Sequence, residues 1–290
     1  MKKKVCALLL ALTLLLSLAV PAFAAEESRV VLGADLTDEQ IKTVYKLFGI
    51  ERGSVEELKV TNAEERSYLQ GLVEESVIGK NAISCVYVRL LGEGSGLSVD
   101  TYNISWCTAE MYKNALVTAG VTDAKIIVAA PFEVSGTAAL TGIYKAYESM
   151  TGDSLDASAK SVGTQELTIT GKLAEQIGSI DATEIVSGIK EVLSETEKMS
   201  DDELRREIVR IAGEYGVTLS DSQIRQLIDL CRSLEGLDPD ALRERVEQTQ
   251  ETIRRIGEAR DKAAGFYEKL RGFFSAASDF IDRLKGLLNK

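Results

Sequence analysis

The sequence predicts an α+β fold, with a mixed α/β sheet domain followed by an all-α domain that ends in a long amphipathic helix. Residues 28–150 alternate strand-like and helix-like segments in the order βαβαββαβα, which is typical of a mixed sheet packed by helices. Residues 151–237 show helical periodicity without strand-like runs. In residues 238–290 apolar side chains recur every three or four positions. We therefore expect two folded units and a helical extension.

Helices of the first unit are expected to begin at side chains that accept hydrogen bonds from free backbone N–H groups. Thr37 with Gln40 forms a capping box before an apolar stripe, and Asn62 with Glu65 is expected to form another. Thr108 is expected to cap the third helix. The predicted helices of this unit cover residues 36–50, 62–72, 109–120 and 137–150.

Apolar runs between these helices are predicted to form strands at residues 29–32, 57–61, 82–91, 96–106 and 124–130. The third and fourth runs are joined by Gly-Glu-Gly-Ser-Gly, a glycine-rich connection of hairpin length. If these two strands pair, Cys85 and Cys107 lie on neighbouring strands and could form a disulfide bond. The sequence does not fix the register, so a disulfide and free thiols both stay open.

The second unit is divided by capping residues and by glycine or proline. Its predicted helices cover residues 164–177, 182–195, 201–215 and 221–234. The last segment follows from Pro239, and from Leu242 to Leu288 its apolar positions step by four and three residues. This heptad spacing predicts a long packed helix or a coiled coil.

The end of that helix is expected to be an interaction face. Residues 262–290 carry six basic and three acidic residues, in contrast to the acidic remainder of the chain. The face is formed by Phe266, Phe273, Phe274, Phe280 and Ile281. It could pack within the chain, self-associate, bind another envelope protein, or lie on an anionic membrane surface or wall polymer.

Residues 1–24 have the three parts of a secretory signal peptide. Lysines precede an apolar run from Val5 to Val20, and the small-residue sequence Ala-Phe-Ala ends at Ala24. An apolar run of about 16 residues is short for a membrane span. We therefore expect an exported chain whose mature form begins near Ala25.

Composition excludes several classes of function. Without the three lysines of the signal peptide, the chain has 31 basic and 45 acidic residues, a net charge of −14 that disfavours nucleic acid as a partner. The chain has no histidine, so Ser-His-Asp and Cys-His mechanisms are excluded, as are the usual zinc sites. We predict no cofactor and no metal. An enzyme would have to be a carboxylate-dependent hydrolase of wall glycan, with Asp100, Glu110 and Glu133 as candidate acids near strand ends.

The segment from Lys125 to Glu148, KIIVAAPFEVSGTAALTGIYKAYE, places Ser135, Gly136 and Thr137 between a strand and a helix. One interpretation is structural, with Ser135 or Thr137 capping the helix. In the other, backbone N–H groups and hydroxyls at the helix N-terminus bind a small anion. The segment lacks the glycines and the terminal lysine of a nucleotide-binding loop.

Several segments of the first half, in this order, resemble a YpuA-like family of proteins secreted by Gram-positive bacteria, which is a domain of unknown function. They are GADLT, VTNAEERSYL, GKNAISCVYVRLL, GSGLSVDTYNISWCTAEMYKNALVTAGV and VAAPFEVSGTAALTGIYKAYE. The resemblance continues more loosely to about Arg245. It implies export and an intact first domain, and it brings no activity or catalytic residue.

These features together favour an exported, non-catalytic binding or scaffold protein of the cell envelope. Tyr102 and Trp106 could bind a sugar or peptide if they are exposed, although a single tryptophan also suits a core. The alternatives are the carboxylate-dependent hydrolase and the small-anion binder at Ser135 to Thr137.

Overall fold

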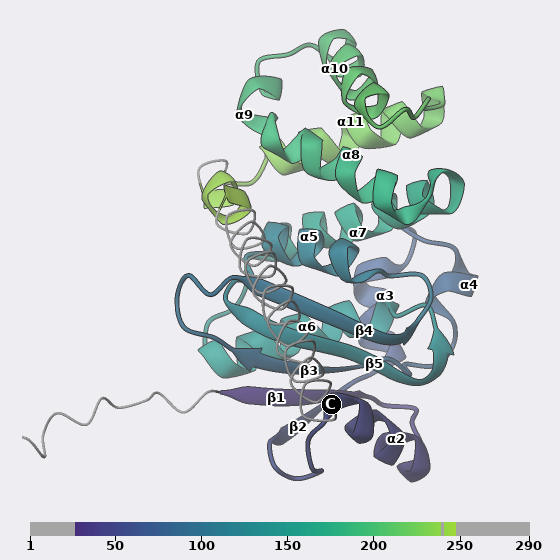
Figure 1. Ribbon diagram of the computed structural model, residues 1–290, viewed down its shortest axis with the longest axis vertical. Coiled ribbons are helices and arrows are strands. Elements are labelled where there is room, and N and C mark those ends of the chain that lie inside the picture. Colours follow the sequence, from purple (N-terminus) through teal and green to yellow (C-terminus); the bar gives the residue numbers. More distant parts are fainter. Residues whose placement is uncertain (1–26, 239–240, 248–290) are drawn as a thin grey trace, which may run out of the picture.

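A computed structural model describes residues 27–238 and 241–247. The chain folds as a five-stranded mixed sheet with helices on both faces and further helical layers stacked on one side (Figure 1). The order of strands across the sheet is β2-β1-β3-β5-β4. The strands are β1 (Ser28–Gly33), β2 (Glu56–Val60), β3 (Cys85–Leu90), β4 (Leu97–Ile104) and β5 (Ala124–Val134).

The expected hairpin between β3 and β4 is wrong, because β5 lies between these two strands. β3 pairs with β5 in antiparallel orientation, with Cys85 opposite Ala129, and β4 pairs with β5 in parallel orientation, with Val99 opposite Ile126. The helix after β4 returns the chain to the start of β5, as parallel pairing requires. β5 is buried along most of its length, as suits a central strand, whereas β4 alternates buried and more exposed residues until Tyr102.

The two faces of the sheet are covered unequally. Helix α2 (Asp38–Phe48) packs against one face, and α5 (Ala109–Ala119) and α6 (Thr137–Thr151) pack against the other. Cys85 lies in the core beneath α2, whereas Cys107 lies in the core beneath α5 and α6. Both thiols are free, so the disulfide is not formed, and burial raises the pKa of each to about 12.

The starts of α2 and α5 follow the sequence pattern, whereas the start of α3 (Asn62–Leu69) is shifted, and α7 (Ala157–Ile177) and α8 (Ser179–Glu191) begin before the predicted residues 164 and 182. Thr37 with Gln40 caps α2, and Thr108 caps α5, as predicted. The capping box of α3 is formed by Thr61 with Glu64, one residue before the predicted pair. This shift leaves Glu65 free to face inward. A helix of four residues, α4 (Glu75–Ile78), follows α3 and was not predicted.

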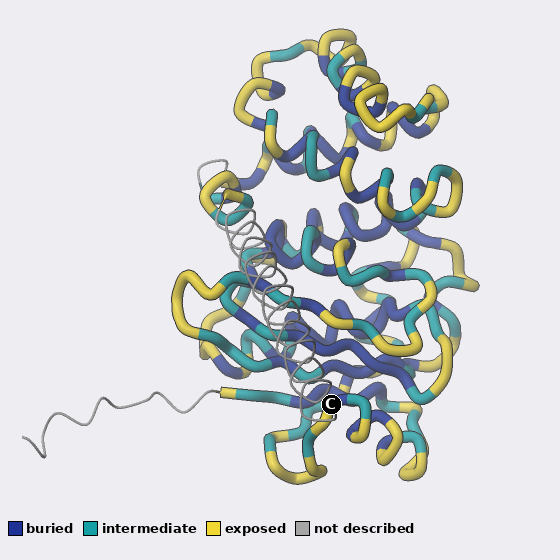
Figure 2. Tube along the Cα trace, viewed as in Figure 1, coloured by how far each residue is buried: buried dark blue, intermediate teal, exposed yellow. Residues whose placement is uncertain are grey.

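The second half is helical, as expected. It contains α7 (Ala157–Ile177), α8 (Ser179–Glu191), α9 (Leu193–Thr196), α10 (Asp201–Glu214) and α11 (Asp221–Glu235). Dark blue buried segments in Figure 2 run from the sheet through α7 and into these outer helices. α7 joins the two halves, because Leu167 belongs to the core of the sheet unit while Leu173 belongs to the core of the outer helices. The domain boundary at residue 150 stays a prediction.

A buried ion pair crosses this junction. Lys190 Nζ of α8 lies 3.1 Å from Glu166 Oε1 of α7, and both side chains are almost fully buried. Thr118 of α5 donates its hydroxyl to Glu166, and Lys190 also donates to the backbone carbonyl of Asn114 at 3.0 Å. Three helices therefore meet around one pair of charges.

The interaction face formed by Phe266, Phe273, Phe274, Phe280 and Ile281 lies outside the described residues, as does the signal peptide. Within the described part of the chain, no helix has the length and apolar character needed to cross a membrane.

Candidate functional site

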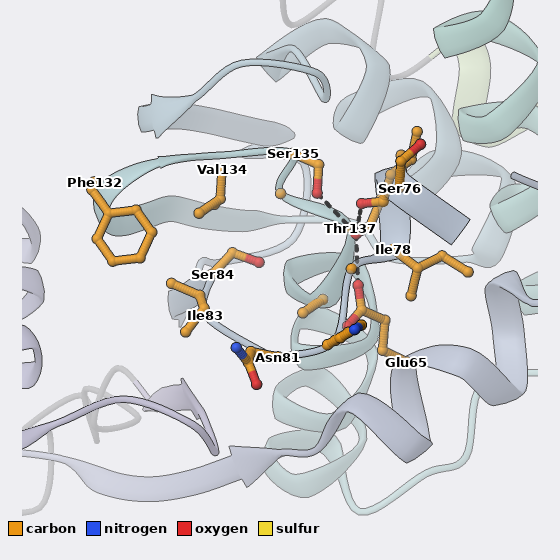
Figure 3. A pocket seen from close by; sticks show the side chains of 15 residues that line it. Glu65, Ser76, Ile78, Asn81, Ile83, Ser84, Phe132, Val134, Ser135 and Thr137 are labelled. Carbon is orange, nitrogen blue, oxygen red and sulfur yellow. Dashed lines mark hydrogen bonds between the residues drawn. The ribbon is translucent and has the colours of Figure 1, made fainter. Parts of the chain in front are cut away.

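A pocket of about 300 Å³ opens where β5 ends and α6 begins. Its wall comes from β5 and α6, from α3 and α4, and from the loop that leads into β3 (Figure 3). The antiparallel pairing of β3 with β5 brings the start of one strand beside the end of the other. The lining residues are Glu65, Ser76, Val77, Ile78, Gly79, Lys80, Asn81, Ile83, Ser84, Phe132, Val134, Ser135, Gly136, Thr137 and Ala138. The three residues predicted as a binding segment are thus part of a hollow.

The polar centre of the pocket is the carboxylate of Glu65, which is only 1% exposed. Thr137 Oγ1 donates to Glu65 Oε1 at 2.6 Å, and Asn62 Nδ2 donates to Glu65 Oε2 at 3.0 Å. Arg66 Nε donates to Asn62 Oδ1 at 2.9 Å, which orients the amide so that its nitrogen faces Glu65. A carboxylate buried without a bonded cation is stabilised here by these two neutral donors.

The hydroxyl of Ser135 extends this chain of hydrogen bonds. Ser135 Oγ lies 3.2 Å from Thr137 Oγ1. When Glu65 is ionised, the single hydroxyl proton of Thr137 is directed to it, and Thr137 then accepts from Ser135. The proton of Ser135 therefore points toward Thr137, and its oxygen lone pairs remain for another donor. Figure 3 shows Ser135, Thr137 and Glu65 in this succession along the pocket wall.

Backbone contacts hold the turn that carries Ser135. Cys107 N donates to Ser135 O at 3.0 Å, and the hydroxyl of Tyr112 donates to the carbonyl of Gly136. Gly136 has a φ of 97°, in the left-handed region. Hydrogen bonds from Tyr112 on α5 and from Cys107 just before α5 thus hold the turn in place.

The capping interpretation of this turn is wrong. Gly136 is the residue that precedes α6, and no side chain caps the helix. Thr137 is instead 1% exposed and directed to Glu65, while Ser135 is part-buried at the pocket. The hydroxyls are free of a capping role because the helix begins at a glycine.

Burial raises the pKa of the Glu65 carboxyl, against the opposing effects of the Thr137 and Asn62 hydrogen bonds and the charge of Arg66. The folded state therefore keeps this proton at a pH where the unfolded state has lost it. Stability from this group is full below the unfolded pKa of about 4.3, and it falls as pH rises through the folded value. Relative to the wild type, Glu65→Gln should gain stability as pH rises from 4 to 8, measured by urea unfolding.

Glu64, the neighbouring residue, supplies the control for this experiment. Burial acts to raise its pKa, but hydrogen bonds from Lys145 and Thr61 outweigh burial, and the pKa is lowered. Its stabilisation is present at neutral pH and is lost as pH falls through the folded value. In a urea series extended below pH 4, Glu64→Gln should therefore lose stability relative to the wild type as pH rises toward the unfolded pKa of about 4.3, which is the opposite sign. Trends of the same sign for the two variants would contradict the assignment for Glu65.

The structure does not bring the predicted carboxylates into this pocket. Asp100 on β4 and Glu133 on β5 are exposed, and Glu110 is paired with Lys113 at 2.9 Å. Asp100 lies opposite Ile127, six residues before Glu133. At about 3.3 Å per residue, the two acids are separated by roughly 20 Å along the strands. They do not form a catalytic pair.

Among the described residues that line the pocket, Glu65 is the one carboxylate and Lys80 the one basic residue. Within the ranges that the structure covers, no three His, Cys, Asp or Glu residues are grouped as a metal site would require.

The two aromatic residues that the sequence offered as binding candidates, Trp106 and Tyr102, lie in different surroundings, and neither lines the pocket. Trp106 packs against the cores beneath α6 and α3, and its Nε1 donates to Glu175 Oε1 at 2.7 Å, so it joins the two halves. Tyr102 is 43% exposed but does not line the pocket. Phe132, which the sequence reasoning did not single out, is 50% exposed at the pocket.

Glu65 was also missed as a site residue, since it was assigned to the capping box of α3. A signal was present in the sequence. Glu65 precedes Leu69 by four residues, and residues four apart lie on the same face of a helix. Leu69 is buried, and Glu65 shares its inward face.

The fold and the pocket define a mixed α/β protein with stacked helical layers and a small polar pocket, in which Glu65 is the one carboxylate among the described lining residues. The chain belongs to the family described as "Protein of unknown function (DUF1002)", which matches residues 32–251. The Uncharacterized protein YpuA of Bacillus subtilis (strain 168) is 37% identical over 248 residues, which cover 84% of this chain and 85% of that protein. The YpuA-like resemblance is thereby confirmed. No solved structure matches the chain significantly.

Proposed function

We propose that the chain is an exported, non-catalytic binding protein of the bacterial cell envelope, which holds a small polar group of its ligand in the Glu65 pocket. The observation that carries the proposal is a buried carboxylate beside an open hollow, with a chain of oriented hydroxyls leading to it. Buried polar groups of this kind, converging on one hollow, are the usual features of a ligand site.

Binding accounts for this site better than hydrolysis does. Glycoside hydrolysis uses two carboxylates, one on either side of the reacting bond. Among the described residues that line this pocket, Glu65 is the one carboxylate. Ser135 donates to Thr137, a hydroxyl, and no basic side chain accepts its proton in this chain of bonds.

The site also disfavours the anion-binding alternative. Thr137 and Ser135, whose hydroxyls were expected to donate to an anion, are directed toward Glu65. An anion would place a second negative charge near that carboxylate, in a protein whose net charge is already −11.

Export rests on the N-terminal sequence, in which lysines, an apolar run and Ala-Phe-Ala succeed one another. A protein that acts outside the membrane meets wall polymer, membrane surface and secreted molecules. We therefore place the ligand in the envelope.

A pocket-blocking variant tests this function. Ser76 lies at the pocket on α4 and is exposed, so Ser76→Trp should obstruct the hollow without entering the core. The mature wild type should sediment with an isolated Gram-positive envelope fraction, and Ser76→Trp should lose most of that retention. Ser67→Trp is the control, since Ser67 is exposed on the neighbouring helix α3 and outside the pocket. Equal retention of the two variants, or no retention of the wild type, would contradict the proposal.

A further inference from the structure

We propose that the group held in the Glu65 pocket is a neutral polyhydroxylated ring, namely a sugar unit with its hydroxyls toward Ser135 and an apolar face on Phe132. This inference rests on the proposed binding function and names the class of ligand.

The hydrogen-bond direction selects a ligand that donates. Thr137 gives its proton to Glu65 and accepts from Ser135, so Ser135 Oγ offers lone pairs to a ligand. Ser76, Ser84 and Asn81 add side chains that can both donate and accept. A group that does both, as a sugar hydroxyl does, can satisfy these partners together.

The charge of the pocket selects a neutral ligand. The described lining residues include one carboxylate, Glu65, and one ammonium, Lys80. The N-terminal end of α6 adds partial positive charge. An ion of either sign would meet a like charge in the pocket as well as an opposite one, so the lining gives neither an ammonium nor an anion a one-sided attraction. Neutral hydroxyl groups meet no like charge.

Phe132 supplies the apolar contact. Its side chain is 50% exposed although it follows the buried run of β5, and it lies at the pocket beside Val134 and Ile83 (Figure 3). An exposed aromatic ring next to oriented hydroxyls presents an apolar face and polar partners at one site. Sugar rings carry C–H faces and hydroxyl edges in the same arrangement. A volume of about 300 Å³ is sufficient for one such unit, with the rest of a chain left outside.

Titration calorimetry with the full mature chain tests the assignment, using N-acetylglucosamine, its β-1,4-linked dimer and glucose as probes. Methylamine and inorganic phosphate represent the cationic and anionic classes. At least one sugar should bind the wild type, and neither ion should bind. Phe132→Ala and Ser135→Ala should each weaken sugar binding by about 2- to 12-fold, as expected for one aromatic contact or one hydrogen bond. Tyr102→Ala, at a similarly exposed aromatic outside the pocket, should leave the affinity unchanged.

Each other outcome overturns the inference in a recognisable way. If methylamine or phosphate binds the wild type and Ser76→Trp abolishes that binding, the pocket is a ligand site and the sugar assignment is wrong. If sugars bind but Phe132→Ala and Tyr102→Ala behave alike, the sugar lies elsewhere. If no probe binds while Ser76→Trp still abolishes envelope retention, the sugar class is wrong and the binding function stands. If retention also survives Ser76→Trp, the binding function is wrong as well.

Discussion

Replacing Lys190 with methionine should lower the free energy of unfolding by about 3–5 kcal/mol, the usual cost of leaving a buried charge without its partner. Glu166 is fully buried between α7, α8 and α5, and after the change the Thr118 hydroxyl would be its one remaining side-chain donor among the residues that the structure describes. Urea unfolding at pH 7 measures the loss. The effect should exceed that of any exposed ion pair in the protein.

Lys42→Met is the matched control for this prediction. Lys42 Nζ lies 2.6 Å from Glu39 Oε1, closer than the 3.1 Å of the buried pair, but the two side chains are 61% and 82% exposed. Its loss should cost about 0–1 kcal/mol. Replacing both buried partners, in Glu166→Leu with Lys190→Met, should recover much of the stability, because no orphan charge remains. If Lys190→Met lowers the free energy of unfolding no more than Lys42→Met does, Glu166 is not a buried charge that depends on Lys190.

Local features of the fold could be predicted from the sequence because they depend on neighbouring residues. A capping box is complete within four positions, so Thr37 with Gln40 and Ser220 with Gln223 were both predictable. The apolar run of β5 indicated a buried strand for the same reason. The order of strands was not predictable, since an apolar run says that a strand is buried but not which strand lies beside it. The short connection between β3 and β4 therefore suggested a hairpin. In the structure β5 lies between these two strands.

The part of the candidate site that consists of consecutive residues could be predicted from the sequence, and the part contributed by a distant helix could not. Ser135, Gly136 and Thr137 are consecutive, and their position between strand and helix was visible in the sequence. Glu65 is 72 residues from Thr137 along the chain, and only the packing of α3 beside α6 brings their side chains together. Asn62 and Arg66 on the same helix then orient the carboxylate. Because the capping box of α3 was predicted one residue too late, Glu65 was assigned to the cap and its role in the pocket was missed.

Gly136→Ala is expected to destabilise the protein and to disrupt the site at once. Gly136 has a φ of 97°, and an added Cβ would lie 2.6 Å from Ile104 Cγ2 and 2.6 Å from the hydroxyl oxygen of Tyr112. The left-handed backbone costs an alanine about 1–2 kcal/mol, and forcing a methyl group into packed surroundings costs about 1–3 kcal/mol more. Urea unfolding should therefore show a loss of about 2–5 kcal/mol.

Gly152→Ala separates these two contributions. Gly152 has a φ of 75°, also in the left-handed region, but nothing lies within 4 Å of its added Cβ. It should show only the backbone cost, about 1–2 kcal/mol, with envelope retention intact. Gly136→Ala should also lose retention, because relief of the clash with Tyr112 and Ile104 must move the turn, and with it the hydroxyl of Ser135 away from Thr137. Equal losses of stability in the two variants, with retention preserved in both, would mean that the turn tolerates a side chain and does not hold Ser135 in place.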